Sequence, residues 1–218
     1  MDRPQIKICG LTDVNEAIQC ADAGADAIGL VFFDKSPRNV SEKLASDISK
    51  ALPEKIASVG VFVNESYEFI MNKVNKCRLT AVQLHGDESP ELVDRLTQDK
   101  VCVIKALYMD SEPGISGMGD YAATSFLVEC SKGVLPGGNA LSWNFSRVKN
   151  LETVKPLIIA GGLSPVNIKD AVLSALPDIV DVSSGVEKAP GKKDIAKVKT
   201  FIEIVNACNI DKKLRRLF

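Results

Sequence analysis

Short runs of aliphatic residues alternate with longer amphipathic segments along almost the whole chain. Eight of these runs are apolar at nearly every position, which is typical of parallel β-strands that are covered on both faces. They span residues 5–9, 27–31, 58–63, 81–84, 101–106, 125–128, 157–160 and 179–182. Because parallel strands need long crossover connections, the pattern predicts an α/β protein.

Helical patterns fill most of the crossovers. They span residues 14–23, 41–52, 67–74, 88–96, 166–173 and 194–207. Thr12 or Asp13 can cap the first helix, Ser41 can cap the second, and Pro90 suits the first turn of the fourth. Residues 110–121 are rich in Gly, Ser and Pro, and residues 146–151 leave room for only a short helix. We therefore expect the helix after the fifth strand to be weak or missing.

Eight strands with seven or eight crossovers in 218 residues predict a single-domain (β/α)₈ barrel, a TIM barrel, near the lower size limit of that fold. No linker or second domain is visible, so we assign residues 1–218 to one barrel. A doubly wound open sheet is the alternative, but no G-x-G-x-x-G motif follows the first run. The end of the chain, about 209–218, is basic, and we interpret it as a frayed, solvated tail.

Charge and composition narrow the class of protein. The net charge is −1, which favours neither nucleic acid nor an anionic membrane, and no apolar run approaches the length of a membrane span. Six cysteines without CxxC pairing and a single histidine predict neither a metal site nor a disulfide framework. Together with the absence of a secretory signal, this predicts a cytoplasmic protein with reduced cysteines.

The seventh and eighth runs each end in a turn of small residues. Gly161-Gly162 follows one run and Ser183-Ser184-Gly185 follows the other. Such turns present backbone N–H groups and allow close approach, which suits a phosphate group. In a (β/α)₈ barrel the usual phosphate site lies after strands seven and eight, so this pair predicts one phosphate held between them.

Strand ends also supply candidate chemical groups, because the active site of such a barrel is built there. Lys7 and Cys9 share one face of the first strand, and a lysine fits the barrel interior better than the helix-covered face. Cys9 then lies at the barrel mouth, where a neighbouring cation can lower the pKa of its thiol and make it a base or nucleophile. The alternative is that Cys9 is a small buried apolar residue.

Three further strand ends carry polar residues. Arg38 follows the second strand, where a guanidinium suits a carboxylate or phosphate, although a solvated loop arginine is equally consistent. Gln83 and His85 share one face of the fourth strand and need polar partners; we interpret His85 as a hydrogen-bonded structural histidine and count both among the substrate-binding candidates. Glu129 ends the sixth strand and is placed to act as a general acid, unless it is a surface loop glutamate.

Asp181 lies on the eighth strand, which neighbours the first strand in a closed barrel. It shares a face with Ser183, and it can pair with Lys7 as a structural ion pair close to the site. We include it with the substrate-binding candidates, while favouring the structural role.

Several ordered motifs resemble one known family, phosphoribosylanthranilate isomerase. The similar stretches are KICGLT at 7–12, GADAIGLVF at 24–32, KSPR at 35–38, VGVFVN at 59–64, VQLHG at 82–86, AGGL at 160–163, DVSSGVE at 181–187 and PGKKD at 190–194. They cover nearly the whole chain in order. The resemblance implies a (β/α)₈ barrel that isomerises N-(5′-phosphoribosyl)anthranilate in tryptophan synthesis by an Amadori rearrangement, without a metal or organic cofactor.

The resemblance also implies roles for individual residues. The general base of the family falls on Cys9, the general acid on Glu129, and the arginine that contacts the anthranilate end on Arg38. The phosphate turns fall on Gly161, Gly162, Ser183, Ser184 and Gly185. The expected partner is a small phosphoribosyl substrate, bound by a monomer or homodimer.

Two departures from the family pattern stand out. The acid is normally an aspartate, and Glu129 adds one methylene. The following loop, PGGNALSW at 136–143, is shorter by about one residue and has Ser142 where an aspartate normally precedes the tryptophan. Two other functions stay open: a non-catalytic phospho-sugar binding barrel, and a related Amadori isomerase of histidine synthesis, which uses two aspartates.

Overall fold

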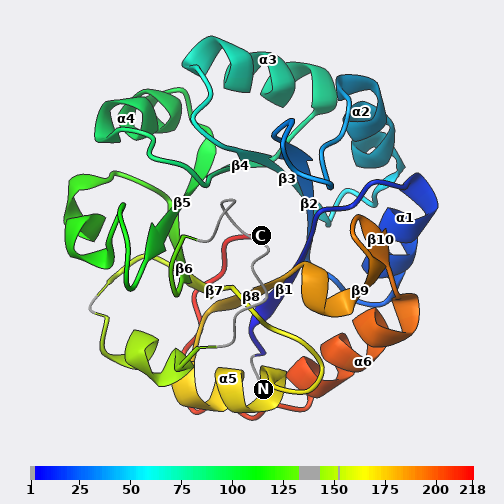
Figure 1. The fold of residues 1–218 in the computed structure, drawn as a ribbon, viewed down its shortest axis with the longest axis vertical. Coiled ribbons are helices and arrows are strands. Elements are labelled where there is room, and N and C mark those ends of the chain that lie inside the picture. The colour runs from blue at the N-terminus through cyan, green and yellow to red at the C-terminus, as the bar shows by residue number, and fades with distance from the viewer. Residues whose placement is uncertain (1–2, 133–142, 152) are drawn as a thin grey trace.

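Eight parallel strands close into a barrel in the order in which they occur in the sequence (Figure 1). The computed structural model describes residues 3–132, 143–151 and 153–218. The strands are β1 (Gln5–Cys9), β2 (Ala27–Phe32), β3 (Ala57–Phe62), β4 (Ala81–Leu84), β5 (Cys102–Tyr108), β6 (Ser125–Glu129), β7 (Leu157–Ile159) and β8 (Ile179–Val182). Because β1 pairs with both β2 and β8, the sheet has no open edge, which confirms the barrel and excludes the doubly wound sheet.

Helices surround the barrel in a ring (Figure 1). They are α1 (Val14–Asp22), α2 (Glu42–Ala51), α3 (Tyr67–Cys77), α4 (Pro90–Gln98), α5 (Ile168–Ala175) and α6 (Ile195–Asn206). Asp13, rather than Thr12, caps α1 by accepting a hydrogen bond from the Glu16 N–H, and Ser41 caps α2 in the same way. Pro90 occupies the first turn of α4, where its missing N–H costs nothing.

Among the described residues, the helices in the crossovers after β5 and β6 are short 3₁₀ helices, as their sequences predict. These are η1 (Ile115–Asp120) and η2 (Phe145–Asn150). A third 3₁₀ turn, η3 (Ser184–Val186), follows β8 and leads into a small hairpin of β9 (Glu187–Ala189) and β10 (Lys192–Lys193). None of the helices in the described ranges has the length and apolar character that a membrane crossing requires.

Two layers of apolar side chains form the core. The larger layer lies between the strands and the helices, and a smaller cluster fills the barrel. The inner cluster contains Ala27, Val59, Ala81, Ile104, Ala106, Leu127, Ile158, Ala160 and Ile179. The interior is therefore filled with side chains rather than open, and a ligand can only lie at the strand ends.

The basic C-terminal segment is not a frayed tail, so that interpretation is wrong. Leu217 and Phe218 pack against the inner cluster, and the C-terminal end lies over the barrel axis (Figure 1). The Gln5 side chain donates to the Phe218 carbonyl at 2.6 Å and accepts from the Leu217 N–H at 2.8 Å. Arg215 donates to the fully buried Asp178 through Nε and Nη2, at 3.0 and 2.6 Å. The segment is held because Asp178 and Gln5 need these polar partners.

We predict that Arg215→Ala lowers the free energy of unfolding by about 3 kcal/mol, the low end for breaking a buried ion pair. The loss stays at the low end because Lys212 lies 3.6 Å from Asp178 and the Leu157 N–H still donates to it. Urea unfolding measures the change. Lys213→Ala, in an exposed position of the same segment, is the control and should change stability by less than about 0.5 kcal/mol. Equal effects of the two substitutions would contradict the role of Arg215.

Candidate active site

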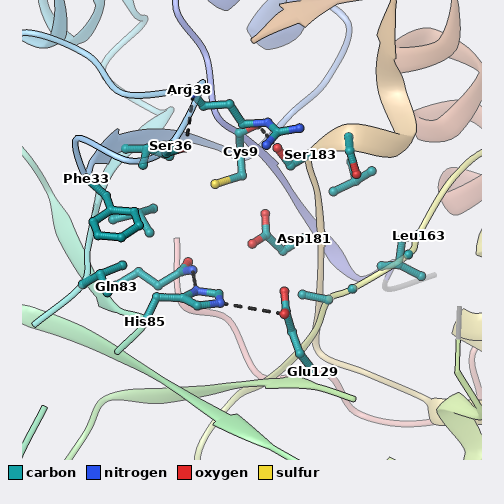
Figure 2. Close-up of a pocket in the computed structure, with 18 residues that line it drawn as sticks. Cys9, Phe33, Ser36, Arg38, Gln83, His85, Glu129, Leu163, Asp181 and Ser183 are labelled. Atoms are coloured by element: carbon teal, nitrogen blue, oxygen red, sulfur yellow. Dashed lines mark hydrogen bonds and ion pairs between the residues drawn. The ribbon is translucent and has the colours of Figure 1, made fainter. Parts of the chain in front are cut away.

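A pocket opens at the carboxyl ends of the strands, the place where the active site of a (β/α)₈ barrel is built (Figure 2). Every strand-end candidate of the sequence except Gly185 lines it. These residues are Cys9, Arg38, Gln83, His85, Glu129, Gly161, Gly162, Asp181, Ser183 and Ser184. The structure therefore brings together side chains that lie up to 175 positions apart in the sequence, from Cys9 to Ser184.

Lys7 and Asp181 form an ion pair inside the barrel, as predicted, and Asp181 also lines the pocket. Lys7 Nζ donates to Asp181 Oδ2 at 2.9 Å, and neither side chain is more than 7% exposed. Burial is the largest single effect and lowers the pKa of Lys7, but the charges and hydrogen bonds of Asp181 and Cys9 together outweigh it, and the pKa is raised. The second carboxylate oxygen, Asp181 Oδ1, has no hydrogen-bond partner in the described residues.

Cys9 lies at the floor of the pocket, two residues after Lys7 on the same face of β1. Gly29, opposite it on β2, leaves space for the sulfur, since a Cβ there would lie 2.7 Å from Cys9 Sγ. The expectation that a neighbouring cation lowers the pKa of this thiol is wrong. Burial raises the pKa of Cys9, and the opposing charges of Lys7 and Lys193 do not compensate.

Arg38 is held by a carboxylate that we did not predict as part of the site. Its Nε and Nη2 donate to the two Glu187 oxygens at 2.8 and 2.7 Å, and Lys193 Nζ donates to Glu187 Oε1 at 2.9 Å. Burial favours the neutral form of Glu187, but the two cations prevail and its pKa is lowered. Two cations on one anion leave a net positive charge beside the pocket. Both Glu187 and Lys193 lie in the quoted DVSSGVE and PGKKD motifs, which were the available signal.

Gln83 and His85 contact each other but are not fully hydrogen-bonded. Gln83 Nε2 lies 2.7 Å from His85 Nδ1, whereas His85 Nε2 and Gln83 Oε1 have no hydrogen-bond partner in the part of the chain described. The interpretation of His85 as a satisfied structural histidine is therefore wrong. Instead, its Nε2 lies 3.8 Å from the Oε2 of Glu129 (Figure 2).

Glu129 is a pocket residue and not a surface glutamate. It is 6% exposed at the end of β6, and its side chain points into the pocket (Figure 2). The altered loop at 136–143 lies outside the described residues except for Trp143. The Trp143 Nε1–H donates to the Ala160 carbonyl at 3.1 Å, which ties the end of that loop to β7.

The two small-residue turns after β7 and β8 touch each other. Gly161 and Gly162 have φ values of +84° and +68°, a region that favours glycine. A Cβ at Gly185 would lie only 1.9 Å from the Leu163 carbonyl oxygen, so no larger residue fits without moving the turns apart. Gly185 does not line the pocket itself and acts by allowing this contact.

Among residues 3–132, 143–151 and 153–218 there is no cluster of three or more His, Cys, Asp or Glu side chains that could hold a metal ion.

The structure combines a closed (β/α)₈ barrel, small-residue turns after β7 and β8, and an acid and a thiol in one pocket. This combination is typical of barrel enzymes that act on phosphorylated small molecules. Residues 6–204 match the model of the N-(5′-phosphoribosyl)anthranilate (PRA) isomerase family. The chain belongs to this family.

Relatives and solved structures agree with this assignment. The chain is 50% identical to the N-(5′-phosphoribosyl)anthranilate isomerase of Desulfatibacillum aliphaticivorans, over 98% of each chain. It is 41% identical to that of Geotalea uraniireducens, over 91% of this chain and 97% of the relative. The phosphoribosyl anthranilate isomerase structure from Thermotoga maritima superposes with a TM-score of 0.84 at 36% identity, covering 93% and 98% of the two chains.

One similar structure contains a ligand. It is a phosphoribosyl anthranilate isomerase in complex with reduced 1-(o-carboxyphenylamino)-1-deoxyribulose 5-phosphate, with a TM-score of 0.81 at 36% identity over 93% and 98% of the chains. The family assignment gives this chain its function, PRA isomerisation in tryptophan biosynthesis. Which residues carry out the reaction is a separate question.

We predict that Cys9 reacts slowly with iodoacetamide at neutral pH and that its rate rises steeply only above about pH 9. Its pKa is raised, so the reactive thiolate is a small fraction at pH 7 and grows as the pH increases. Alkylation at a series of pH values, followed by peptide mapping, gives the rate at this one cysteine. Glutathione is the reference thiol. Limited access to Cys9 lowers its alkylation rate by the same factor at every pH, whereas a raised pKa shifts the plot of rate against pH. A profile that levels off below pH 8 would contradict the raised pKa.

Proposed function

We propose that this pocket isomerises PRA by acid–base chemistry, with Cys9 as the base and Glu129 as the acid. The observation that carries the proposal is the placement of the two groups. They enter one pocket from opposite sides, with Asp181 between them in the view of Figure 2, and the small-residue turns line the same pocket. A sugar whose phosphate is bound at those turns then has Cys9 on one side and Glu129 on the other.

Each proton transfer then has a residue to perform it. Glu129 donates a proton to the furanose ring oxygen as the bond from that oxygen to C1′ breaks, which gives an open-chain iminium ion. Cys9 removes the C2′ proton, and the electron pair neutralises the iminium nitrogen to give an enolamine. Tautomerisation of the enolamine gives the ketone, 1-(2-carboxyphenylamino)-1-deoxyribulose 5-phosphate. No electron leaves or enters the substrate, so one acid and one base suffice.

As the base, Cys9 takes the C2′ proton in its thiolate form, after its own proton has been lost to solvent. Burial disfavours this charged form, whereas the nearby cations of Lys7 and Lys193 oppose the effect of burial and stabilise the thiolate. After the transfer Cys9 is a neutral thiol, the form that burial favours. Asp181 Oδ1, which has no partner in the described structure, is available to a ribose hydroxyl. Gln83 Oε1 is unpartnered in the same part of the chain and is a second acceptor for the substrate.

Binding at the two anionic ends of the substrate fixes the reacting carbon between the acid and the base. The backbone of Gly161, Gly162, Ser183 and Ser184 is proposed to hold the phosphate. Arg38 is proposed to bind the anthranilate carboxylate through Nη1, because Glu187 already occupies Nε and Nη2. The net positive charge of the Arg38–Glu187–Lys193 group favours an anion at this position.

The proposal extends to partners and location. The substrate is a small phosphoribosyl compound, with no role for nucleic acid or membrane, and no organic cofactor or metal takes part. We propose that the chain acts in the cytoplasm as a monomer or homodimer. One similar structure, at 34% identity and a TM-score of 0.79, contains mutually generated monomers of the dimeric phosphoribosylanthranilate isomerase from Thermotoga maritima, which supports both states.

We predict that Cys9→Ser and Glu129→Gln each reduce kcat by about 10²–10⁴-fold while the fold is retained. Each substitution keeps the size of the side chain but removes the group that transfers a proton, and such transfers contribute about 10²–10⁴-fold each. Turnover of PRA is followed by its fluorescence, and circular dichroism reports the fold. Full activity in either variant would refute its role. A wild-type chain that binds a substrate analogue without turnover would instead favour the non-catalytic binding barrel.

We predict that Gly185→Ala raises KM for PRA by about tenfold or more, because the new methyl group forces the two phosphate turns apart. Gly119→Ala is a matched control, since a Cβ at Gly119 has no atom within 4 Å. The two variants are compared in KM, in kcat and in affinity for inorganic phosphate by calorimetry. Unchanged phosphate affinity in Gly185→Ala would place the phosphate elsewhere.

A further inference from the structure

The carboxylate of Glu129 faces the imidazole ring of His85 across a short gap. His85 Nε2 lies 3.8 Å from Glu129 Oε2, and the two side chains are only 6% and 8% exposed. The imidazole nitrogen has no hydrogen-bond partner in the described residues, although it is buried. A buried polar atom without a partner calls for an explanation, and this one faces the proposed acid (Figure 2).

Gln83 determines which ring nitrogen of His85 carries the proton. Its amide nitrogen lies 2.7 Å from His85 Nδ1, and an amide nitrogen can only donate. His85 Nδ1 must therefore accept, so the neutral ring has its proton on Nε2. This tautomer presents an N–H donor to the Glu129 carboxylate.

The ring is also fixed by its neighbours. The Tyr108 ring meets His85 edge to face, with centroids 6.2 Å apart, and the Tyr108 hydroxyl donates to the His85 carbonyl at 3.4 Å. Gln83 on β4 and Tyr108 on β5 therefore limit rotation of the imidazole away from Glu129.

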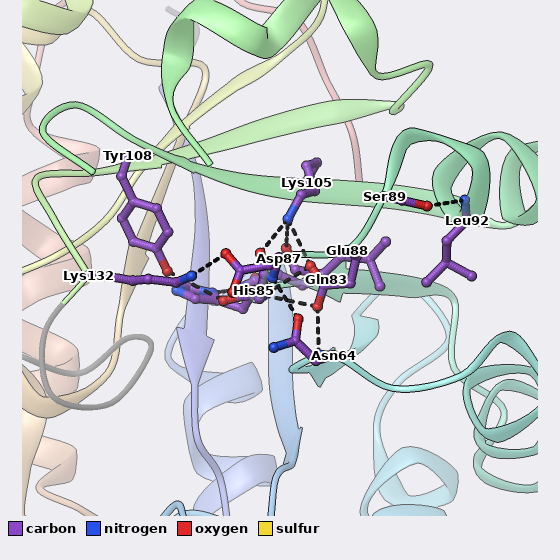
Figure 3. Close-up of polar contacts among 12 residues, drawn as sticks. Asn64, Gln83, His85, Asp87, Glu88, Ser89, Leu92, Lys105, Tyr108 and Lys132 are labelled. Carbon is purple, nitrogen blue, oxygen red and sulfur yellow. Dashed lines mark hydrogen bonds and ion pairs between the residues drawn. The ribbon is translucent and has the colours of Figure 1, made fainter. Parts of the chain in front are cut away.

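A buried ion pair anchors the loop that follows His85 (Figure 3). Lys105 Nζ donates to the Gly86 carbonyl and to Glu88 Oε2, each at 2.8 Å. Glu88 Oε1 in turn accepts from the N–H groups of Gly86, at 2.9 Å, and Asn64, at 3.0 Å. Removing such a pair from water is costly, and these four contacts satisfy its charges while joining the ends of β3 and β4 to the middle of β5. The backbone beside His85 is thus held in one place.

We infer that His85 is a positioning residue that stabilises the Glu129 carboxylate left after proton transfer to the substrate. The inference rests on the proposed function, in which Glu129 is the acid. When Glu129 loses its proton, a negative charge appears in a pocket largely shielded from water, and a preformed N–H donor is worth most there. The gap of 3.8 Å closes to a hydrogen bond when the charge forms, since contacts of this kind tighten as the reaction proceeds.

The tautomer matters as much as the distance. Nε2 already carries a proton, so it has no lone pair with which to take the proton of Glu129 away from the substrate. With the proton on Nδ1 instead, Nε2 would accept from the acid and compete with the ring oxygen. Gln83 therefore keeps the acid available to the substrate, through His85.

Nitrogen NMR of the ring tests the tautomer directly, because His85 is the only histidine in the chain. Tag-free protein with ¹⁵N-labelled histidine gives one pair of ring nitrogen signals at pH 8. We expect the pattern of a neutral ring protonated at Nε2. In Gln83→Glu the neighbour is a carboxylate, which accepts, so the proton should move to Nδ1 or the ring should become charged. A wild-type ring protonated at Nδ1 would overturn the inference.

Kinetics test the consequence. His85→Leu removes the donor and should lower kcat about 100-fold, the usual loss for one preorganised donor to a developing anion, with KM changed less than about threefold. His85→Gln replaces the donor with an amide N–H and should recover at least about tenfold of that loss. Unchanged kcat in His85→Leu, or a change in KM alone, would contradict the role. Should His85→Leu fail to fold, His85→Gln and Gln83→Glu are compared instead, and equal kcat in both would be the contradicting result.

The outcomes separate this inference from the proposed function. If Cys9→Ser and Glu129→Gln lose turnover but His85→Leu does not, Glu129 remains the acid and only the role of His85 fails. If Glu129→Gln keeps full activity, the acid is misassigned, while the NMR result still reports the tautomer that Gln83 imposes.

Discussion

The ion pair between Lys7 and Asp181 joins the first strand of the barrel to the last, and the active site is built on it. The two residues lie opposite each other in the β1–β8 register, and both are buried in the barrel interior. A charge in that interior is tolerated only when it is paired, so the two residues favour the one register that brings them together. Because side chains alternate along a strand, this register places Cys9 one step above Lys7, at the floor of the pocket. Barrel closure and the position of the base thus depend on one contact.

A second group of charges organises the rim. Glu187 stands between Arg38 and Lys193, so the guanidinium is oriented before any substrate arrives. An arginine held in this way loses less entropy on binding than one that is free in solution. The third preorganised element is the contact between Gly185 and Leu163, which fixes the spacing of the two small-residue turns. The groups proposed to bind the two anionic ends of the substrate are therefore already in position before the substrate binds.

Local pattern was enough to predict much of the fold. The eight apolar runs lie within two residues of the observed strands, and the polar segment after β5 forms a 3₁₀ helix as expected. The strand-end rule also brought the candidate residues to one pocket, because the carboxyl ends of parallel strands meet at one face. These features depend on periodicity and on neighbouring residues, which are visible in a sequence.

Barrel closure makes β1 and β8 neighbours, so the contact between Lys7 and Asp181 was predictable, but other contacts between distant segments were not. The partner of Arg38 lies 149 positions away, and the buried pair of Lys105 and Glu88 has no periodic signal. The thiol of Cys9 shows the same limit, since a nearby cation was apparent from Lys7 but the greater effect of burial was not. The basic C-terminal segment resembled a solvated tail because its charges were counted without Asp178, the buried carboxylate that binds Arg215. In each case the missing information is a tertiary neighbour.

The hydrogen bond from Gln5 to Phe218 joins the C-terminal end of the chain to the start of β1, away from the pocket. A linker from residue 218 to residue 3 would make the chain continuous. The eight-strand cycle has no natural starting point once those ends are joined, and a circular permutant opened in the crossover after β5, where η1 has no buried residues, would keep every strand pair. The point at which the polypeptide begins can therefore change without changing which strands are neighbours in the barrel. The arrangement of side chains in the pocket depends only on those neighbours.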